Sequence, residues 1–243
     1  MQRVTATATA AVAAVFLLTS RATAHGGALN YTVGDTWYPG YDPYGPPTQL
    51  TSPSIPQRKW ITTNPIFEAT NASLACNAPG TPVLALIPVP AGSNLTAVYY
   101  SWVHTVGPML VWMTPCPSPG CSTFIPNATT PWFKIAERGL LSGTVVDGMW
   151  FQHEFSNWDG SPSLWSERIP GALASGEYLV RHEIVSLHSA NRPQWYVECV
   201  QVRVEGGEVG GVRVPGEEYL ARIPGVWSMD GEWHGVGLRG GMS

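Results

Sequence analysis

Two stretches of alternating side chains, joined by a short polar interruption, give the clearest structural signal in the sequence. Residues 177–188 and 194–204 are rich in β-branched and aromatic residues with period-two polarity, and the Ser-Ala-Asn-Arg-Pro segment between them contains turn formers. The pattern predicts two strands and a short loop. His188 closes the first stretch, and Gln194 and Tyr196 open the second on one face of its strand. A histidine, an amide and a phenol therefore meet at one end of the predicted pair.

Similar patterns elsewhere predict many more short strands bounded by turn residues. The clearest are 82–89, 94–103, 109–113 and 163–169, and 132–140 fits either a strand or a single helical turn. With abundant Gly and Pro, this arrangement favours an all-β chain built as an antiparallel two-sheet sandwich with long surface loops. We find no internal repeat and no low-complexity linker, so residues 25–243 are expected to form one catalytic domain without an appended binding module.

The region 26–47 is full of Gly, Pro and Tyr, and predicts a short first strand followed by a long surface loop. Tyr41 and Tyr44 lie in this loop and are candidates for a substrate-binding platform. The alternative is a loop packed down by its own tyrosines.

The N-terminal residues have the features of a secretory signal. Arg3 precedes an apolar run over 10–18, and Ala22-Thr23-Ala24 has the small residues of a signal-peptidase site. Removal of residues 1–24 would make His25 the first residue of a secreted, extracellular protein. No other apolar run is long enough to cross a bilayer, so we expect no membrane partner.

Composition points to an uncharged partner. Charged residues make up 12% of the chain and the formal net charge is −4, which leaves no basic surface for nucleic acid. The 11 Trp residues fit core packing, although a few at the surface could stack on sugar rings.

Four cysteines in a secreted chain predict two disulfides, with three possible pairings. Cys116 and Cys121 flank a tight Pro-Ser-Pro-Gly loop that a local bridge would hold, which leaves Cys76 to pair with Cys199. Asn30, Asn71, Asn94 and Asn127 each begin an N-glycosylation sequon, as expected for a secretory route.

An ordered set of segments resembles the fungal lytic polysaccharide monooxygenases of auxiliary activity family nine. The segments are His25, the His104 that precedes Gly-Pro, the Phe-Lys-Ile-Ala-Glu-Arg-Gly-Leu run at 133–140, the run at 169–188 ending in Ile-Val-Ser-Leu-His, and Gln-Trp-Tyr at 194–196. The resemblance extends from His25 to about residue 204. It implies an immunoglobulin-like or fibronectin-like sandwich and the same two disulfides.

The resemblance also implies a copper site. His25 would bind one copper ion through its α-amine and imidazole, and His104 would supply a second imidazole. Three nitrogen donors suit copper and leave positions open for a small oxidant. Tyr196 would be a weak axial oxygen ligand, and His188 and Gln194 would orient and protonate bound oxygen species.

The implied activity is oxidative cleavage of a β-1,4-glucan, cellulose or a related glucan, at C1 or C4 beside the glycosidic bond. An external electron donor and O2 or H2O2 would be consumed, and the enzyme would act as a monomer.

Two departures from the family pattern stand out. Thr105 and Val106 separate His104 from Gly-Pro, where the family usually has one residue. An insertion within a strand would turn the side chain to the other face, so His104 must lie in a loop or bulge to act as a ligand. Residues 228–243 also lack the usual surface-tyrosine ending.

One rival interpretation is a hydrolytic glycosidase, which needs two carboxyl groups flanking the sugar. Glu154, Asp159, Glu167 and Glu183 are available, but their spacing does not distinguish them from ordinary structural acids.

A second rival is a non-catalytic secreted protein of the same fold that binds copper or carbohydrate. The combination of His188, Gln194 and Tyr196 argues against it, because copper storage needs no such groups. His153 and His182 have no partner at a readable spacing and are assigned to structure.

Overall fold

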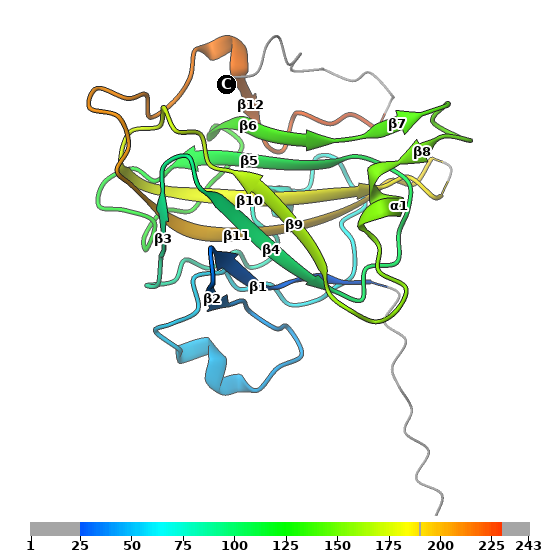
Figure 1. Ribbon diagram of the computed structural model, residues 1–243, viewed down its shortest axis with the longest axis horizontal. Helices are drawn as coiled ribbons and strands as arrows, with labels where there is room; N and C mark the ends of the chain where they lie inside the picture. Colours follow the sequence, from blue (N-terminus) through cyan, green and yellow to red (C-terminus); the bar gives the residue numbers. More distant parts are fainter. Residues whose placement is uncertain (1–24, 190, 230–243) are drawn as a thin grey trace, which may run out of the picture.

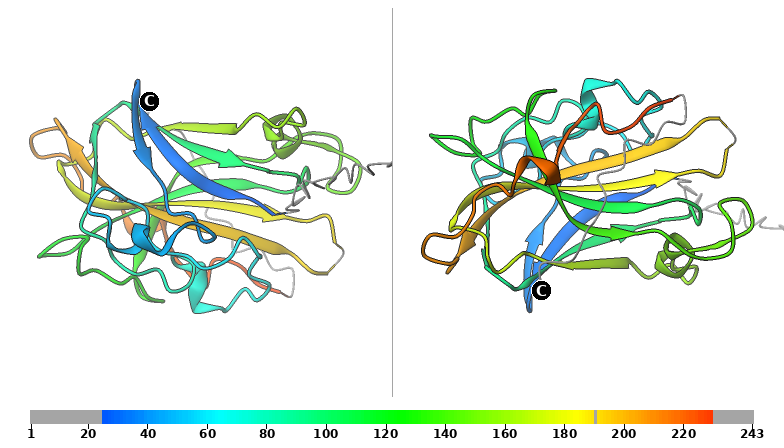
Figure 2. Two further views of the ribbon diagram at one scale, coloured as in Figure 1. Left: turned by 90° about the horizontal axis from the view of Figure 1, so that it is seen from below. Right: turned by 90° about the horizontal axis from the view of Figure 1, so that it is seen from above.

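In the computed structural model, which describes residues 25–189 and 191–229, two β-sheets pack face to face (Figures 1 and 2). The smaller sheet has the order β2 (Thr36–Pro39), β1 (Gly27–Val33), β4 (Asn94–Tyr100) and β9 (Ser163–Arg168). The larger sheet has the order β12 (Leu220–Arg222), β6 (Pro131–Arg138), β5 (Met109–Pro115), β10 (Gly176–Ser186), β11 (Gln194–Glu205) and β3 (Ile87–Pro90). The predicted all-β sandwich is confirmed.

Short elements decorate the sandwich. A small hairpin pairs β7 (Leu140–Ser142) with β8 (Met149–Trp150), and α1 (Phe151–Phe155) follows it. Three 3-10 turns cover Pro47–Thr51, Ala72–Leu74 and Glu217–Tyr219. No helix in the described part of the chain is long and apolar enough to span a membrane.

The predicted pair of long strands lies within the larger sheet. β10 and β11 pair antiparallel over their whole length, from Gly176 opposite Val204 to Ser186 opposite Gln194. This register confirms the hairpin and places Gln194 directly beside the end of β10.

The larger sheet is buried on both faces, which explains why its strands are so rich in apolar residues. Alternate side chains such as Tyr178 and Val180 fill the core between the sheets, with Tyr99 and Trp165 from the smaller sheet. The other face carries Leu179, Trp112, Val185, Trp195 and Val197, covered by loop residues that include Leu74, Ile223 and Trp227.

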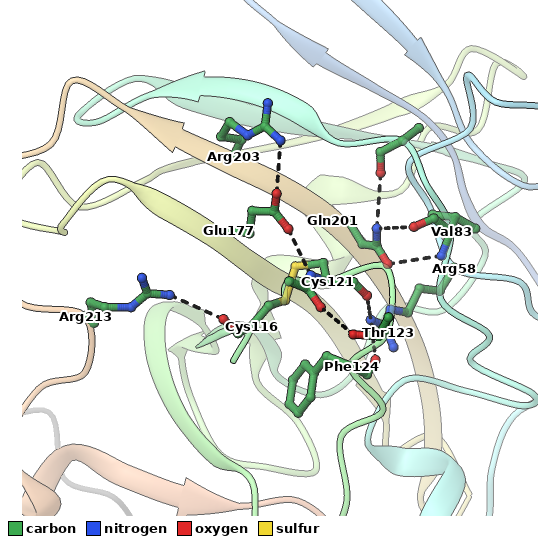
Figure 3. The surroundings of a disulfide bond; sticks show 12 residues. Arg58, Val83, Cys116, Cys121, Thr123, Phe124, Glu177, Gln201, Arg203 and Arg213 are labelled. Carbon is green, nitrogen blue, oxygen red and sulfur yellow. Dashed lines mark hydrogen bonds and ion pairs between the residues drawn. A yellow bond between two sulfur atoms is a disulfide. The ribbon is translucent and has the colours of Figure 1, made fainter. Parts of the chain in front are cut away.

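Both predicted disulfides are formed. Cys76 pairs with Cys199, and Cys116 pairs with Cys121. Figure 3 shows how the short bridge is held: the Glu177 carboxylate accepts from the Cys121 amide at 2.9 Å and from Arg203 at 3.0 Å. The buried Arg58 donates to the carbonyl oxygens of Cys121 and Phe124 at 3.1 and 2.8 Å. This loop closes the end of the sandwich formed by the start of β10.

Two sequence predictions need correction. The strand expected over 82–89 begins only at Ile87. The Gln201 side chain hydrogen-bonds the backbone groups of Val83 and Ala85, so these groups do not pair with a neighbouring strand. β3 also pairs parallel to β11, so one edge of the sandwich is not antiparallel. Of the two structures that the sequence allowed for 132–140, the strand is the one observed, since β6 covers Pro131–Arg138.

Candidate functional site

The sheet register brings the predicted site residues to one end of the sandwich. β1 begins opposite the end of β4, with Gly27 beside Tyr100, and β5 begins beside the end of β10, with Met109 opposite Ile184. His25 immediately precedes β1, His104 follows β4, His188 follows β10, and Gln194 and Tyr196 open β11. Residues far apart in sequence are adjacent here because β1, β4, β5, β10 and β11 all begin or end at the same end of the sandwich.

His104 lies in the loop between β4 and β5, not in a strand. The extra residue before Gly107-Pro108 is therefore accommodated without reversing the face of a strand. Gly107 has a φ of +123°, and a Cβ there would lie 2.0 Å from the Val185 carbonyl oxygen. Only glycine allows the loop to approach β10 this closely.

Two polar side chains hold the loop between β4 and β5 in place. Gln152 in α1 donates its amide to the carbonyl oxygens of Gly107 and Val185, both at 2.8 Å. The Ser156 hydroxyl donates to the His104 carbonyl oxygen at 2.9 Å. The sequence did not predict either residue as part of the site. Both side chains hydrogen-bond backbone carbonyl oxygens, and such bonds have no sequence motif.

His25, His104 and Tyr196 surround one small space. The ring centroids of His25 and His104 are 5.8 Å apart, and the Tyr196 ring lies 5.7 Å from the first and 5.3 Å from the second. Nε2 of His104 is 2.8 Å from the Tyr196 hydroxyl oxygen. The imidazole nitrogen that would be available to a metal thus faces the phenol.

The other two predicted residues join the same cluster. The Tyr196 hydroxyl donates to Oε1 of Gln194 at 2.7 Å, which agrees with their predicted common face. The exposed His188 ring stacks on His104 with centroids 4.6 Å apart and an interplanar angle of 9°. Nδ1 of His188 lies 2.6 Å from the Ser186 hydroxyl, which fixes the orientation of the ring.

Trp102 forms the inner wall of the site. It is 2% exposed, and its ring meets His104 and Tyr196 edge-on at centroid distances of 5.3 and 5.0 Å. In the sequence, only its position two residues before His104 distinguishes Trp102 from the tryptophans that fill the core. It supplies a rigid apolar surface that keeps water from the inner side of the cluster.

The environment keeps His104 neutral. Burial lowers the pKa of His104 to about 4, with further contributions from the neighbouring His188 and His25. Burial also raises the pKa of the Tyr196 phenol well above its ordinary value. Near neutral pH the site therefore presents an unprotonated imidazole and an intact phenol, which is the state in which histidine binds a metal.

The donor set fits copper only with an unblocked N-terminus. The described residues contain no group of three or more His, Cys, Asp or Glu side chains that could hold a metal. Two imidazoles face each other with a phenol, and the third nitrogen donor would be the α-amine of His25. While residues 1–24 are attached that nitrogen is an amide, so processing after Ala24 would create the site.

Tyr41 and Tyr44, the two loop tyrosines predicted as a substrate platform, differ sharply in solvent exposure. Tyr41 is 8% exposed and packs with Ile55 and Trp60, so its assignment to a substrate platform was wrong. Tyr44 is 59% exposed, and its hydroxyl lies 3.1 Å from that of Thr63. The sequence alone could not separate them, because both lie in the same Pro/Gly-rich loop.

The acids of the hydrolase alternative are spread over the fold. Glu183 is buried in an ion pair with Arg181 at 2.8 Å, and Glu167 pairs with Arg138 at 2.8 Å. Glu154 and Asp159 are exposed. Among the sequon asparagines, Asn71, Asn94 and Asn127 are exposed, and Asn30 is partly buried within β1.

Comparison with known proteins places the chain in a family. Residues 25–233 match the model of Auxiliary Activity family 9 (formerly GH61). The chain belongs to this family. The match begins at His25 and includes every residue of the cluster described above.

Relatives within the family share both sequence and fold. The chain is 40% identical over 221 residues to AA9 family lytic polysaccharide monooxygenase B of Heterobasidion irregulare, covering 90% of this chain and 86% of that one. It is 38% identical to AA9 family lytic polysaccharide monooxygenase D of Thermothelomyces thermophilus, over 87% of this chain and 80% of that one.

Solved structures of family members have the same fold as this chain. The crystal structure of HiLPMO9B superposes with a TM-score of 0.76 at 39% identity, over 86% of this chain and 89% of that one. A cellulose-active polysaccharide monooxygenase from M. thermophila gives a TM-score of 0.71 at 34% identity, over 84% and 87% of the two chains. Family membership makes this chain a copper-dependent polysaccharide monooxygenase rather than a hydrolase.

Proposed function

We propose that the chain is a secreted enzyme that oxidatively cleaves β-1,4-glucan, such as cellulose, at C1 or C4, with copper bound by His25 and His104. The observation that carries the proposal is the convergence of two imidazoles and a phenol at the edge where the family match begins. The comparison with a cellulose-active structure at 34% identity supports the substrate.

His25 and His104 would hold the metal. His25 contributes its imidazole and, after removal of residues 1–24, its α-amine, whose ordinary pKa of about 7.7 to 8.0 lets it lose a proton to a metal near neutral pH. His104 needs no deprotonation because its pKa is already lowered to about 4. When bound, copper supplies one-electron redox chemistry, which with H2O2, or with O2 and two electrons from an external donor, converts a sugar C–H to C–OH and releases water.

The remaining residues control protons and water. Tyr196 keeps its proton and directs it to Gln194, so its oxygen would offer at most a weak bond to a copper ion held by the two histidines. His188 lies face to face with His104 and is open to solvent, so it could carry a proton between solvent and the space beside His104. Trp102 closes the inner side of the site.

The substrate would lie across the exposed end of the sandwich. Tyr44 is 59% exposed in the loop after β2, where its hydroxyl lies 3.1 Å from that of Thr63, and it is a candidate sugar contact. Trp158 is 66% exposed and follows Ser156, whose hydroxyl bonds His104. Aromatic planes of this kind stack on the C–H faces of sugar rings, and an open surface suits a crystalline polymer that cannot enter a pocket.

Secretion and maturation belong to the same proposal. The segment 1–24 lies outside the described residues, so its role as a signal peptide rests on its sequence and on the start of the family match at residue 25. Maturation would leave residues 25–243 as one catalytic domain, acting as a monomer. The exposed sequons at Asn71, Asn94 and Asn127 are proposed glycosylation sites, and Asn30 is a fourth.

Product analysis tests the proposed activity. The mature, copper-loaded protein is incubated with amorphous cellulose, ascorbate and air, and soluble products are examined by mass spectrometry. We expect aldonic acids, 4-keto sugars or both, and their loss when a copper chelator is added. Native oligosaccharides alone would indicate hydrolysis, and an absence of products on cellulose and on other β-glucans would favour the non-catalytic copper protein.

A further inference from the structure

A groove lies at the end of the sandwich opposite the proposed metal site. It is formed where β5 ends and β10 begins, whereas His104 precedes the start of β5 and His188 follows the end of β10. Its volume is about 770 Å³, within the range of sites that hold small molecules. The lining combines the end of β5, the loop of the short disulfide, the segment before β6 and the segment after β11, and includes Pro115, Cys116, Pro119, Phe124, Asn127 and Arg213.

Asn127 identifies a candidate occupant, because it lines the groove and also begins the sequon Asn-Ala-Thr at 127–129. Its side chain is exposed, and its Oδ1 atom accepts from the amide and the hydroxyl of Thr129 at 2.9 and 2.7 Å. Both bonds are made by Oδ1, whereas a glycan is joined to Nδ2. A glycan on Asn127 would therefore start at the wall of the groove.

Phe124 offers a flat apolar surface in the same groove, three residues before Asn127. Its ring is partly buried against the hydrophobic cluster on the outer face of the larger sheet, and part of it stays open to the groove. Aromatic planes of this kind stack on the C–H faces of sugar rings. The other sequon asparagines have no aromatic residue at this spacing, since Gly27, Glu68 and Ala91 precede Asn30, Asn71 and Asn94.

Backbone hydrogen bonds hold Phe124 and Asn127 in fixed positions. The Phe124 carbonyl oxygen accepts from the buried Arg58 at 2.8 Å. The Asn127 amide donates to the Thr130 hydroxyl at 2.9 Å, and the Asn127 carbonyl oxygen accepts from the Thr130 amide at 3.0 Å. Binding to groups that are already ordered costs little conformational entropy. A sugar attached at Asn127 would thus meet the Phe124 ring without having to order the loop.

Two charged side chains in the lining suit the polar groups of a sugar. Glu177 lines the groove together with Arg213, and its side chain is 26% exposed. The Glu177 carboxylate accepts from Cys121 and Arg203, and Arg213 donates to the Cys116 carbonyl oxygen at 3.4 Å (Figure 3). A carboxylate has about four acceptor positions and a guanidinium has five N–H donors, so both retain capacity for hydroxyl or acetamido groups.

We propose that this groove binds the N-acetylglucosamine attached to Asn127, with the sugar ring stacked on Phe124. The inference rests on the proposed glycosylation of Asn127 and does not depend on copper. The bound sugar would join the loop closed by Cys116 and Cys121 to the segment before β6. Because only the folded chain forms the groove, the sugar would act as an attached ligand that stabilises the fold.

Occupancy of the sequon is tested first. The mature protein is secreted from a fungal host and loaded with copper, and its glycopeptides are identified by mass spectrometry. We expect a glycan on Asn127. An unmodified Asn127 would overturn the proposal.

The contact with Phe124 is tested by a double-mutant cycle in this glycoprotein. Thr129→Ala prevents glycosylation of Asn127, and Phe124→Leu keeps an apolar side chain but removes the flat ring. We expect the effect of Thr129→Ala on the unfolding equilibrium constant in urea to be at least about fivefold larger in the wild type than in the Phe124→Leu background. Phe124→Tyr keeps the ring and should retain the coupling. Equal effects of Thr129→Ala in the wild-type and Phe124→Leu backgrounds would overturn the proposal.

Trimming the glycan identifies which sugar makes the contact. Endoglycosidase H leaves one N-acetylglucosamine on the asparagine, so the coupling between Thr129→Ala and Phe124→Leu should persist after treatment. Coupling that disappears on trimming would place the contact beyond the first sugar and contradict the inference. Thr96→Ala is the matched control, because it removes the sequon of Asn94 and a hydroxyl bonded to Ser166 at 3.0 Å. Its effect should be the same with and without Phe124→Leu.

Product analysis separates this inference from the proposed function. Thr129 lies at the opposite end of the sheet from the metal site, so Thr129→Ala should release oxidised products from cellulose at the wild-type rate. Absence of oxidised products from both proteins would refute the proposed function and leave the unfolding result standing.

Discussion

His25 carries more of the proposed site than any other residue, because it offers two nitrogen donors only when it is N-terminal. We predict that His25→Ala abolishes tight copper binding, with a loss larger than the roughly 10- to 100-fold cost of losing an outer hydrogen-bond partner. One additional residue before His25 should have the same effect. Calorimetric copper titration checks this, with His153→Ala as the control because that histidine is exposed on α1. Unchanged affinity in either His25 variant would refute the two-histidine site.

Tyr196 is predicted to tune the metal rather than to hold it. Tyr196→Phe removes the hydroxyl that lies 2.8 Å from His104 and bonds Gln194. We expect copper affinity to remain within about tenfold, the copper spectrum to change, and turnover to fall about 10- to 100-fold.

A matched control for the Tyr196 variant exists at the far end of the same sheet. Tyr178→Phe also removes a hydroxyl bonded at 2.8 Å, in this case to the Ala174 carbonyl oxygen. It should leave the electron paramagnetic resonance spectrum of bound copper unchanged. An identical spectrum in Tyr196→Phe would argue against an axial role for the phenol.

At the scale of elements, the loop between β4 and β5 decides whether His104 can act. Gly107 combines a φ of +123° with a contact that any Cβ would make with Val185, so Gly107→Ala combines strain with a clash. We expect at least about 2 kcal/mol of destabilisation and weaker copper binding. Gly34→Ala is the control: its φ is +55° and nothing lies within 4 Å, so it should cost only about 1 kcal/mol. Urea unfolding measures both, and equal costs would contradict the role of the close approach.

The local signals along the chain were sufficient for most elements. Alternation predicted β10 and β11 and the shared face of Gln194 and Tyr196, because a strand repeats every two residues wherever it lies in a fold. Local patterns failed where a distant side chain intervened. Gln201 displaces strand pairing at Val83 and Ala85, and the packing of Ile55 and Trp60 buries Tyr41 but not Tyr44.

At the scale of the whole molecule, two buried titratable groups between the sheets should shape stability against pH. His182 and Glu198 face each other across β10 and β11, exposed by only 1% and 2%. Burial lowers the pKa of His182 to about 3 from 6.5, and raises the pKa of Glu198 to about 8 from 4.5. The unfolded chain therefore protonates His182 first as pH falls, and ionises Glu198 first as pH rises.

The two effects cancel between pH 4.5 and 6.5, because on unfolding His182 gains a proton while Glu198 releases one. Below pH 4.5 only His182 contributes, and stability falls as pH falls toward 3; above pH 6.5 only Glu198 contributes, and stability falls as pH rises toward 8. We expect His182→Gln to remove up to about 1.4 kcal/mol per pH unit from the acid slope, and Glu198→Gln as much from the alkaline slope. Urea unfolding of metal-free protein across pH measures the slopes, and His153→Gln should change neither. Wild-type slopes in both variants would contradict the burial of His182 and Glu198 in their uncharged forms.

The sequence by itself determined the fold class, the cysteine pairing and the identities of His25, His104, His188, Gln194 and Tyr196. These follow from strand periodicity, from the short loop between Cys116 and Cys121, and from the ordered family segments, all of which are written along the chain. The tertiary structure alone decided which side chains meet: Trp102 against the rings of His104 and Tyr196, and Gly107 against β10. The reason is physical, because these contacts join residues as far apart as Trp102 and Tyr196 and depend on where strands end in space, which local periodicity does not encode.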